Sequence, residues 1–116
     1  MKYVHLYTGD DGESHFKDVE IEMKDTKDRG QRSEPVRAKT IFFSATDPRF
    51  EVDWHKVPGR RFVITIEGED EVTASDGTKR RFGPGDIMLA DDAESRGHIS
   101  RTLSNTARKK IFVTLE

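Results

Sequence analysis

Short apolar runs, cut at close intervals by glycine, proline and aspartate, constrain the fold of this 116-residue chain more than any other feature. Phe62–Ile66 and Glu71–Ala74 have the composition of strands, and Asp76-Gly77 follows them directly. An Asp-Gly pair is a strong signal for a two-residue hairpin turn, because that turn needs a positive φ at both central residues. Turn signals between runs of this length are typical of a sandwich or barrel. The sequence therefore predicts an all-β fold.

Similar runs continue along the rest of the chain and predict roughly ten short strands. The expected strands cover residues 2–7, 16–23, 36–45, 50–54, 62–66, 71–74, 78–82, 87–90, 98–103 and 108–115. One segment, residues 24–35, is strongly polar and is predicted to be a loop. This segment is interpreted either as a solvated connector or as a functional lid.

Composition and charge narrow the functional classes. Charged residues make up 36% of the chain, but the formal net charge is only −2, which argues against a nucleic-acid partner. Cysteine is absent, so disulfides and thiolate zinc sites are excluded. No apolar stretch reaches the ~20 residues of a membrane span, and the first residues lack a signal-peptide core. The sequence predicts one cytoplasmic domain, 1–116, that interacts with no membrane.

The block from residue 54 to 103 resembles the small single-domain cupins. The resemblance lies in the run Ile66–Val72, which contains Gly68, and in the later run Phe82-Gly-Pro-Gly-Asp86. The local physics agrees, because Gly68 suits a tight strand exit and Gly85 suits a left-handed position after a proline. The resemblance implies a single cupin-like domain, an antiparallel jelly-roll β-barrel whose core motifs span residues 54–103.

The resemblance also implies a metal site, and this chain departs from it. The family places two histidines and a glutamate before the glycine, and a third histidine after the Pro-Gly-Asp turn. His55 and His98 match two of these ligands, whereas Val57 and Arg61 stand at the other two positions. A permanently charged guanidinium repels a divalent cation. The expected site is therefore degenerate and holds no metal or other cofactor.

Alternatives stay open for the two matching histidines. His55 and His98 are interpreted as hydrogen-bonded structural residues or as substrate contacts, and imidazole titrates near neutrality, as a general base requires. In the metal-dependent alternative they bind Fe, Mn, Ni or Zn, and carboxylates of Asp53, Asp91 or Asp92 replace the missing ligands.

Arg61 draws attention because of its position in a strand. Side chains two residues apart share a face, so Arg61, Val63, Thr65 and Glu67 point one way. In the resembled fold this face lines the barrel. A guanidinium there needs an anionic partner. That partner is either a protein carboxylate, from Asp53 or Glu67, or a carboxylate of a bound ligand.

The opposite face of the same strand carries Phe62, Ile64 and Ile66, more apolar surface than one barrel needs, and predicts a homodimer. Trp54, the single tryptophan, is interpreted as capping the barrel mouth, lying in a subunit interface or packing in the core.

The sequence thus predicts a small-molecule-binding barrel that favours an anionic ligand such as a carboxylate. The expected ligand-binding residues are His55, Arg61, His98, Trp54 and Thr65. The alternatives are a metal-dependent dioxygenase or isomerase and, more remotely, a sensor or interaction domain with an empty barrel. No catalytic residue is identified, because the chain shows neither a nucleophile with its base nor a phosphate-binding loop.

Overall fold

Twelve β-strands and no helix occur in residues 1–49, 51–55 and 58–116, the part of the chain that the computed structural model describes. The strands are β1 (Lys2–Thr8), β2 (Ser14–Glu20), β3 (Lys24–Thr26), β4 (Gly30–Arg32), β5 (Ala38–Thr46), β6 (Glu51–His55), β7 (Arg61–Glu67), β8 (Asp70–Ala74), β9 (Lys79–Phe82), β10 (Ile87–Asp91), β11 (His98–Thr102) and β12 (Arg108–Leu115). The predicted all-β class is confirmed. These described ranges contain no helix that could span a membrane.

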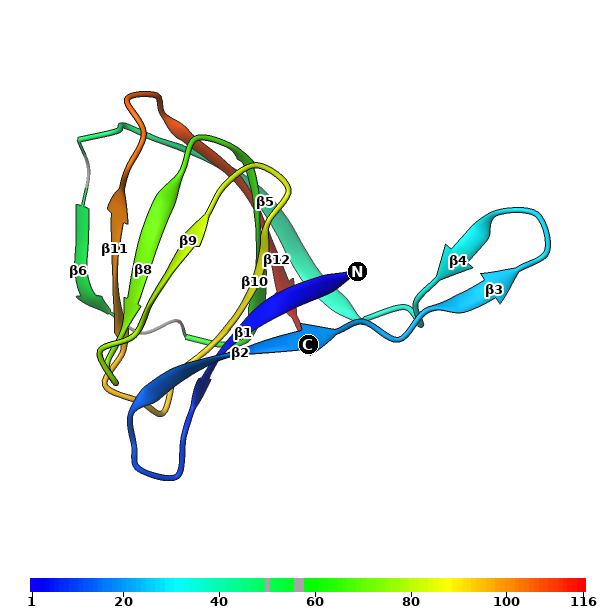
Figure 1. Ribbon diagram of the computed structural model, residues 1–116, viewed down its shortest axis with the longest axis horizontal. Coiled ribbons are helices and arrows are strands. Elements are labelled where there is room, and N and C mark those ends of the chain that lie inside the picture. The colour runs from blue at the N-terminus through cyan, green and yellow to red at the C-terminus, as the bar shows by residue number, and fades with distance from the viewer. Residues whose placement is uncertain (50, 56–57) are drawn as a thin grey trace.

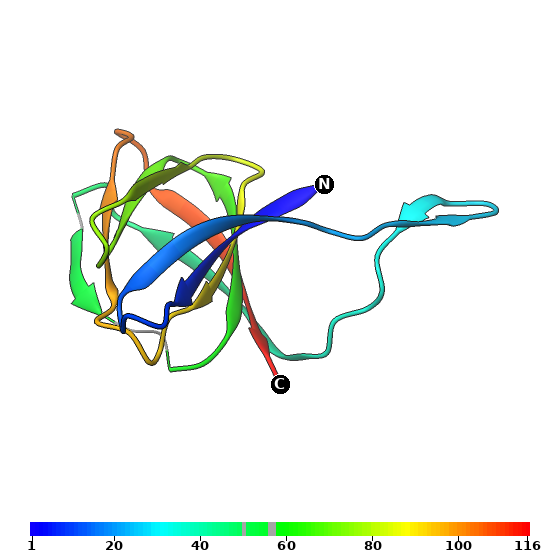
Figure 2. The same ribbon diagram turned by 60° about the horizontal axis from the view of Figure 1, so that its bottom comes forward.

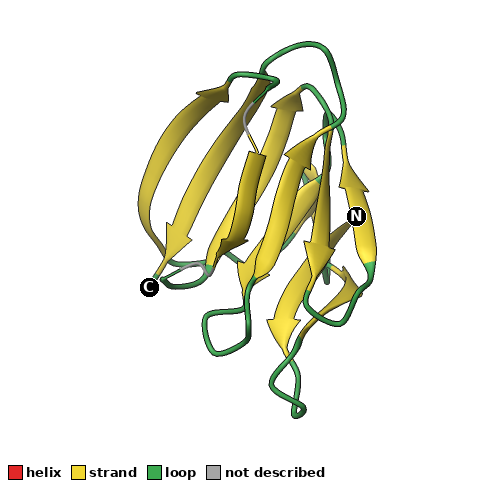
Figure 3. Cartoon of the chain, turned by 90° about the vertical axis from the view of Figure 1, so that its left-hand side faces the viewer, coloured by secondary structure: helices red, strands yellow, loops and turns green. Residues whose placement is uncertain are grey.

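Two sheets form the body of the molecule and face each other (Figure 1). The larger has the strand order β2-β1-β10-β7-β12-β5, and the smaller has the order β6-β11-β8-β9. Figure 3 looks onto the smaller sheet with the larger one behind it. Within the described residues the two ladders remain separate, so the strands do not form one closed barrel.

One strand pair departs from the antiparallel arrangement that was expected. β1 pairs with β10 in parallel, from Val4 opposite Met88 to Tyr7 opposite Asp91. β1 then turns back into β2, which pairs with it antiparallel from Lys2 to Thr8. The prediction of a wholly antiparallel sheet is therefore wrong at β1, because one edge of β1 pairs with its hairpin partner β2 and the other edge pairs in parallel with β10, a strand distant in sequence.

The core lies between the sheets and follows the period-two pattern of the strands. Leu6, Val63 and Met88 come from the larger sheet, whereas Val72 and Phe82 come from the smaller one, and all five are buried. Burying an apolar side chain of this size contributes about 1.5–3 kcal/mol. Because both sheets supply these residues, the core holds the sheets together face to face.

Both predicted turn glycines have the backbone conformation that their positions require. Gly68 has a φ of 81°, and a Cβ there would lie 2.9 Å from the backbone oxygen of Ala107. Gly85 has a φ of 90°, and its amide donates to the carbonyl oxygen of Thr65 at 2.9 Å. The glycines that the sequence analysis placed at strand ends and turns therefore lie at such positions in the structure.

The polar segment 24–35 is not a plain loop, and this prediction is corrected. β3 and β4 pair as a short hairpin, here called the arm (residues 24–32), which projects away from both sheets (Figure 2). The Thr26 hydroxyl donates to the carbonyl oxygen of Gly30 at 2.7 Å and accepts the amide of Arg29 at 3.1 Å. Local side-chain and backbone bonds thus shape a hairpin that buries no apolar residue.

Candidate functional site

A cavity of about 160 Å³ lies between the two sheets, lined by strands from both. Its middle is mainly apolar: by strand register Val63, Met88 and Phe112 lie side by side in the larger sheet, and Val72 lies beside Ser100 in the smaller one. Charged side chains and histidines occupy its ends, namely His55, Arg61, His98, Arg108 and Lys110, with Ala90 beside Arg61. The volume is below the ~300 Å³ at which ordinary ligand pockets begin, so the cavity suits a small molecule.

Arg61 enters the cavity from the start of β7. Arg61 and Val63 line the cavity, whereas Phe62 and Ile64 lie on the outer side of the sheet, as the alternation predicts. The Nε atom of Arg61 is buried and has no hydrogen-bond partner in the described part of the chain. Glu67, one predicted partner, pairs instead with Lys109 at 3.0 Å.

The other predicted partner of Arg61, Asp53, has a side chain that lies outside the described residues, and so does Val57. Among the side chains that are described, no carboxylate lies within ion-pair distance of Arg61. Within the described side chains the guanidinium therefore brings a positive charge to the cavity wall without a paired carboxylate, which favours an anion there.

Two more cations reach the cavity from β12, and sequence reasoning missed both. Arg108 and Lys110 share one carboxylate oxygen of Asp70, at 3.0 Å and 2.6 Å. Arg108 also donates to the Ser100 hydroxyl at 2.9 Å. Asp70 and Arg108 are almost fully buried, and burial lowers the pKa of Lys110, which the charge of Asp70 partly opposes. One carboxylate thus faces two cations.

A sequence signal for this cluster exists in β12. Arg108, Lys110 and Phe112 are spaced by two, so they share the inward face of that strand. Asp70 lies two residues after Gly68, at the start of β8. Recognising that these groups meet requires knowledge of the sheet order, because Asp70 and Lys110 are 40 residues apart in the chain and in different sheets.

The two predicted histidines come together at one end of the cavity. β6 and β11 pair so that His55 is opposite His98, and their ring centroids lie 4.1 Å apart at 60°. The Nδ1 atom of His98 is hydrogen-bonded to the Asp92 carboxylate at 2.5 Å, and both residues are buried. Asp92 lies behind His98 and fixes the ring, which leaves Nε2 as the nitrogen available to a ligand.

Gly97 permits this close approach of the histidine strands, and sequence reasoning overlooked it. Gly97 has a φ of 90°, and a Cβ on it would lie 2.3 Å from the carbonyl oxygen of His55. Only glycine fits both constraints. A glycine directly before a candidate site histidine was the available signal.

Two predicted site residues lie elsewhere. Trp54 is 51% exposed on β6 and is not among the residues that line the cavity, so the core interpretation is wrong. Thr65 is buried, but its backbone amide donates to Asp86 and its carbonyl accepts from Gly85, which holds the turn before β10. Asp91, a proposed substitute ligand, pairs with His5 at 3.0 Å, and neither lines the cavity.

Among the described side chains, the donor set does not fit a divalent metal ion. Within the described ranges, no group of three or more histidine or carboxylate side chains is placed to hold one. His98 already uses one ring nitrogen on Asp92, and Arg61, Arg108 and Lys110 line the same cavity. Divalent metals need several neutral or anionic donors, whereas these side chains supply positive charge.

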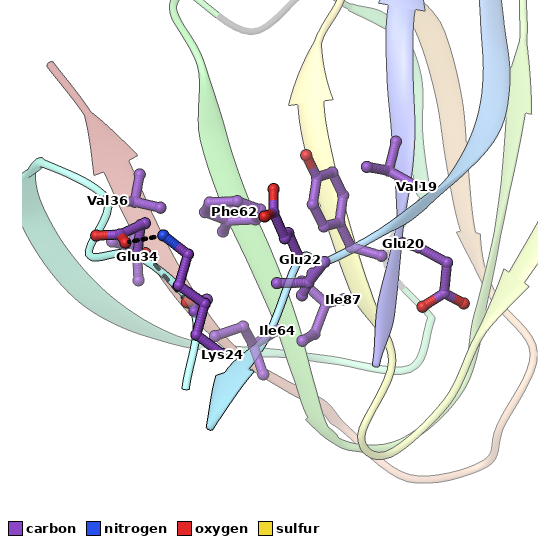
Figure 4. Close-up of a pocket in the computed structure, with 13 residues that line it drawn as sticks. Val19, Glu20, Glu22, Lys24, Glu34, Val36, Phe62, Ile64 and Ile87 are labelled. Carbon is purple, nitrogen blue, oxygen red and sulfur yellow. Dashed lines mark hydrogen bonds and ion pairs between the residues drawn. The ribbon is translucent and has the colours of Figure 1, made fainter. Parts of the chain in front are cut away.

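A second hollow, here called the outer groove, lies on the opposite face of the larger sheet (Figure 4). It has a volume of about 490 Å³. Its floor consists of Tyr3, Phe62, Ile64, Ile87 and Val113. Where the arm leaves the body, the ion pair between Lys24 and Glu34, at 2.9 Å, borders the groove. The groove is apolar and open, in contrast to the cavity.

Comparison with known proteins gives the fold alone. The structure is similar to the crystal structure of a conserved protein of unknown function from Streptococcus pyogenes, with 19% sequence identity and a TM-score of 0.50. The match covers 66% of this chain and 62% of that chain, so less than two thirds of the neighbour's length is represented. No protein-family model and no curated protein matches the sequence.

Proposed function

We propose that this protein is a cupin-like barrel that binds a small anionic molecule in the cavity between its sheets. The observation that carries the proposal is the charge of that cavity. Arg61, Arg108 and Lys110 line it, and Asp70 is the carboxylate that neutralises one of them. A site that has lost its metal ligands and gained cations is suited to a carboxylate or a similar anion.

The cupin-like part of the proposal is supported by the arrangement of the strands. Two sheets face each other around a cavity, and Gly68 and Gly85 exit their strands at the positions that the resemblance indicates. His55 and His98, which match two ligand positions of the family in the sequence, lie close together, with ring centroids 4.1 Å apart. The jelly-roll barrel stays a proposal, since a fold of this kind serves many functions.

A charge-assisted hydrogen bond to Arg61 would contribute about 1.5–3 kcal/mol to anion binding. The test replaces Arg61 by glutamate and titrates acetate and Mn²⁺ separately into wild-type and variant protein, with binding heat as the readout. Arg61→Glu should abolish acetate binding and raise affinity for Mn²⁺, because it restores the ligand type of the family. Arg60→Glu is the matched control, since Arg60 is half-exposed and pairs with Asp91.

The metal-dependent alternative, a dioxygenase or an isomerase, makes the opposite prediction. Metal analysis of purified wild-type protein would then find stoichiometric iron, manganese, nickel or zinc, and replacing His55 or His98 would release it. That result would refute the anion-binding proposal. The proposal expects the purified protein to retain no divalent metal and its affinity for Mn²⁺ at pH 7 to be no weaker after either histidine is replaced.

The outer face of the larger sheet supports a second proposal, that two copies of the chain associate through it. Beyond the outer groove the apolar surface continues to Ile41, Phe43 and Ile66, which are 59%, 75% and 52% exposed. Monomeric proteins rarely expose a continuous apolar patch of such extent.

Charge around the outer groove favours a second copy as the partner. Glu20 and Glu22 border the groove, whereas the tip of the arm carries Lys27, Asp28 and Arg29, a net charge of +1. In a two-fold dimer the basic tip of one arm would meet the acidic border of the other copy, and the same contact would occur twice. The partner is therefore proposed to be this same protein.

A further inference from the structure

We infer that the ligand of the cavity is a short dicarboxylate, with one carboxylate at each end of the cavity and an apolar chain between them. This inference rests on the proposed function and specifies the ligand class. Three features carry it: the separation of the cations, the charge at each end and the apolar middle of the cavity.

The cations occupy opposite ends of the cavity because of strand register. On β7, Arg61 is opposite Thr114 of β12, whereas Lys110 of β12 is opposite Thr65. Arg61 and Thr65 are four residues apart, which corresponds to roughly 13 Å along a strand. Arg61 and Lys110 thus lie towards opposite ends of the cavity that both line, and a ligand that contacts both must span it.

Among the described side chains, each end has one cation in excess of the carboxylates that are ion-paired with it. At the end of the cavity that is lined by Lys110, Arg108 and Lys110 share the single carboxylate of Asp70. At the histidine end, Arg61 has no ion pair among the described side chains, and Asp92 is engaged with His98. One carboxylate at each end would therefore neutralise both excess charges.

Unused hydrogen-bond donors point to the same ligand. The Nε atoms of Arg61 and Arg108 are both buried and lack a partner in the described part of the chain. The Arg108 side chain is only 6% exposed. A buried guanidinium N–H that lacks an acceptor is costly, so a ligand oxygen near each one would remove that cost.

The middle of the cavity favours an apolar chain between the two carboxylates of the ligand. Val63, Val72, Met88 and Phe112 line it, and a polar group placed against them would lose its hydrogen bonds to water. The volume of about 160 Å³ equals the bulk-liquid space of about five water molecules, at ~30 Å³ each. An unsubstituted dicarboxylate from succinate to adipate fits both conditions.

Calorimetric titration of wild-type protein tests the inference with matched probes. Succinate, glutarate and adipate are compared with butyrate, which has one carboxylate, and with inorganic phosphate, a compact dianion. At least one dicarboxylate should bind about tenfold or more tighter than butyrate, because it gains a second charge-assisted contact. Phosphate should bind more weakly than that dicarboxylate, because it cannot reach both ends.

Variants at the two ends sharpen the test. Arg61→Gln and Lys110→Gln should each lower the affinity of the best dicarboxylate to the level of butyrate, with the fold checked by circular dichroism. Arg61→Gln is informative even if Lys110→Gln unfolds, because Arg61 takes part in no ion pair of the described structure. Arg60→Gln, on the outer side, should leave every affinity unchanged.

The outcomes separate the two proposals. If butyrate binds as tightly as every dicarboxylate, or phosphate binds tightest, the inference is refuted and anion binding stands. If none of these anions binds, the proposed function fails and the inference fails with it.

Discussion

The two faces of the larger sheet depart in part from the usual pattern of a β-sandwich. The inward face carries Arg61, Arg108 and Lys110 among apolar residues, whereas the outward face carries Phe62 and Ile64 and is apolar. Sheets with one solvated face normally place apolar residues inward and polar residues outward. This placement supports the two proposals, an anion in the cavity of the inward face and a second copy of the chain on the outward face.

The two faces also differ in their effect on the stability of the folded protein. Cations buried on the inward face lose hydration, and only Asp70 compensates for that among the described residues. Exposed apolar groups on the outward face lose little until a partner covers them. Changes on the inward face should therefore affect the stability of the single chain, whereas changes on the outward face should affect association.

The largest effect is expected at the inward charge cluster. Asp70→Asn leaves Arg108 and Lys110 buried without a counter-ion and should lower the free energy of unfolding by about 3–5 kcal/mol, measured by urea denaturation. Asp18→Asn is the matched control, because Asp18 pairs with Arg80 at 3.0 Å on the surface and should cost much less. Equal losses in the two variants would show that the buried cluster contributes no more to the free energy of unfolding than a surface ion pair does.

The outward face should respond in its association state instead. The wild-type protein should sediment at about twice the 13.3 kDa of one chain. Phe43→Ser should weaken the dimer by about 1.5–3 kcal/mol for each Phe43 side chain that the interface buries, with little change in unfolding of the monomer. Trp54→Ser, an exposed aromatic on the other sheet, should leave the dimer intact. A wild-type protein that sediments as a monomer would contradict this view of the outer face.

Backbone strain at the histidine end should have an intermediate effect. Gly97→Ala places a Cβ against the His55 carbonyl oxygen and should destabilise the protein by about 1–3 kcal/mol. Gly30→Ala is the control: Gly30 also has a positive φ, 69°, but open space surrounds it. Urea denaturation should show the larger loss at Gly97, and anion binding should weaken in that variant alone. Similar losses would mean that close packing of β6 on β11 is unimportant.

The smallest effect is expected from a histidine on the solvent side. The hydrogen bond to Asp11 raises the pKa of His15, and Asp76 binds the second ring nitrogen at 2.8 Å. A raised pKa means that this stabilisation is complete below the ordinary value of about 6.5 and is lost as pH rises through the folded value.

His15→Gln should therefore reduce stability near pH 6 and have less effect near pH 9, in urea denaturation at both values. Lys17→Gln, on the same strand, should show no such pH dependence in this range. If the stability difference between wild type and His15→Gln were the same at pH 6 and pH 9, the proposed stabilisation by protonated His15 would be contradicted.

Local features of the fold could be predicted because they depend on residues close together in the chain. Strand positions follow from period-two patterns, and the turns at Gly68 and Gly85 follow from the need for a positive φ. The opposite orientations of Arg61 and Phe62 follow from the same alternation. The arm was missed because a hairpin held by polar side chains has no apolar pattern to reveal it.

The cavity itself was only half predictable. His55, Arg61 and His98 could be proposed from the chain, and all three line it. Arg108 and Lys110 could not, because their placement depends on β12 lying beside β7 and facing Asp70 across the two sheets. The parallel pairing of β1 with β10 depends in the same way on a partner that lies far along the chain.

By itself, the sequence determined the all-β class, the strand exits and the two-faced character of β7, because steric limits and alternation act over a few residues. The tertiary structure alone decided which charges share the cavity. Asp92 became the partner that orients His98, and Asp70 became the counter-ion of Arg108 and Lys110. Electrostatic energy depends on distance in space rather than along the chain, and sheet order and register set that distance.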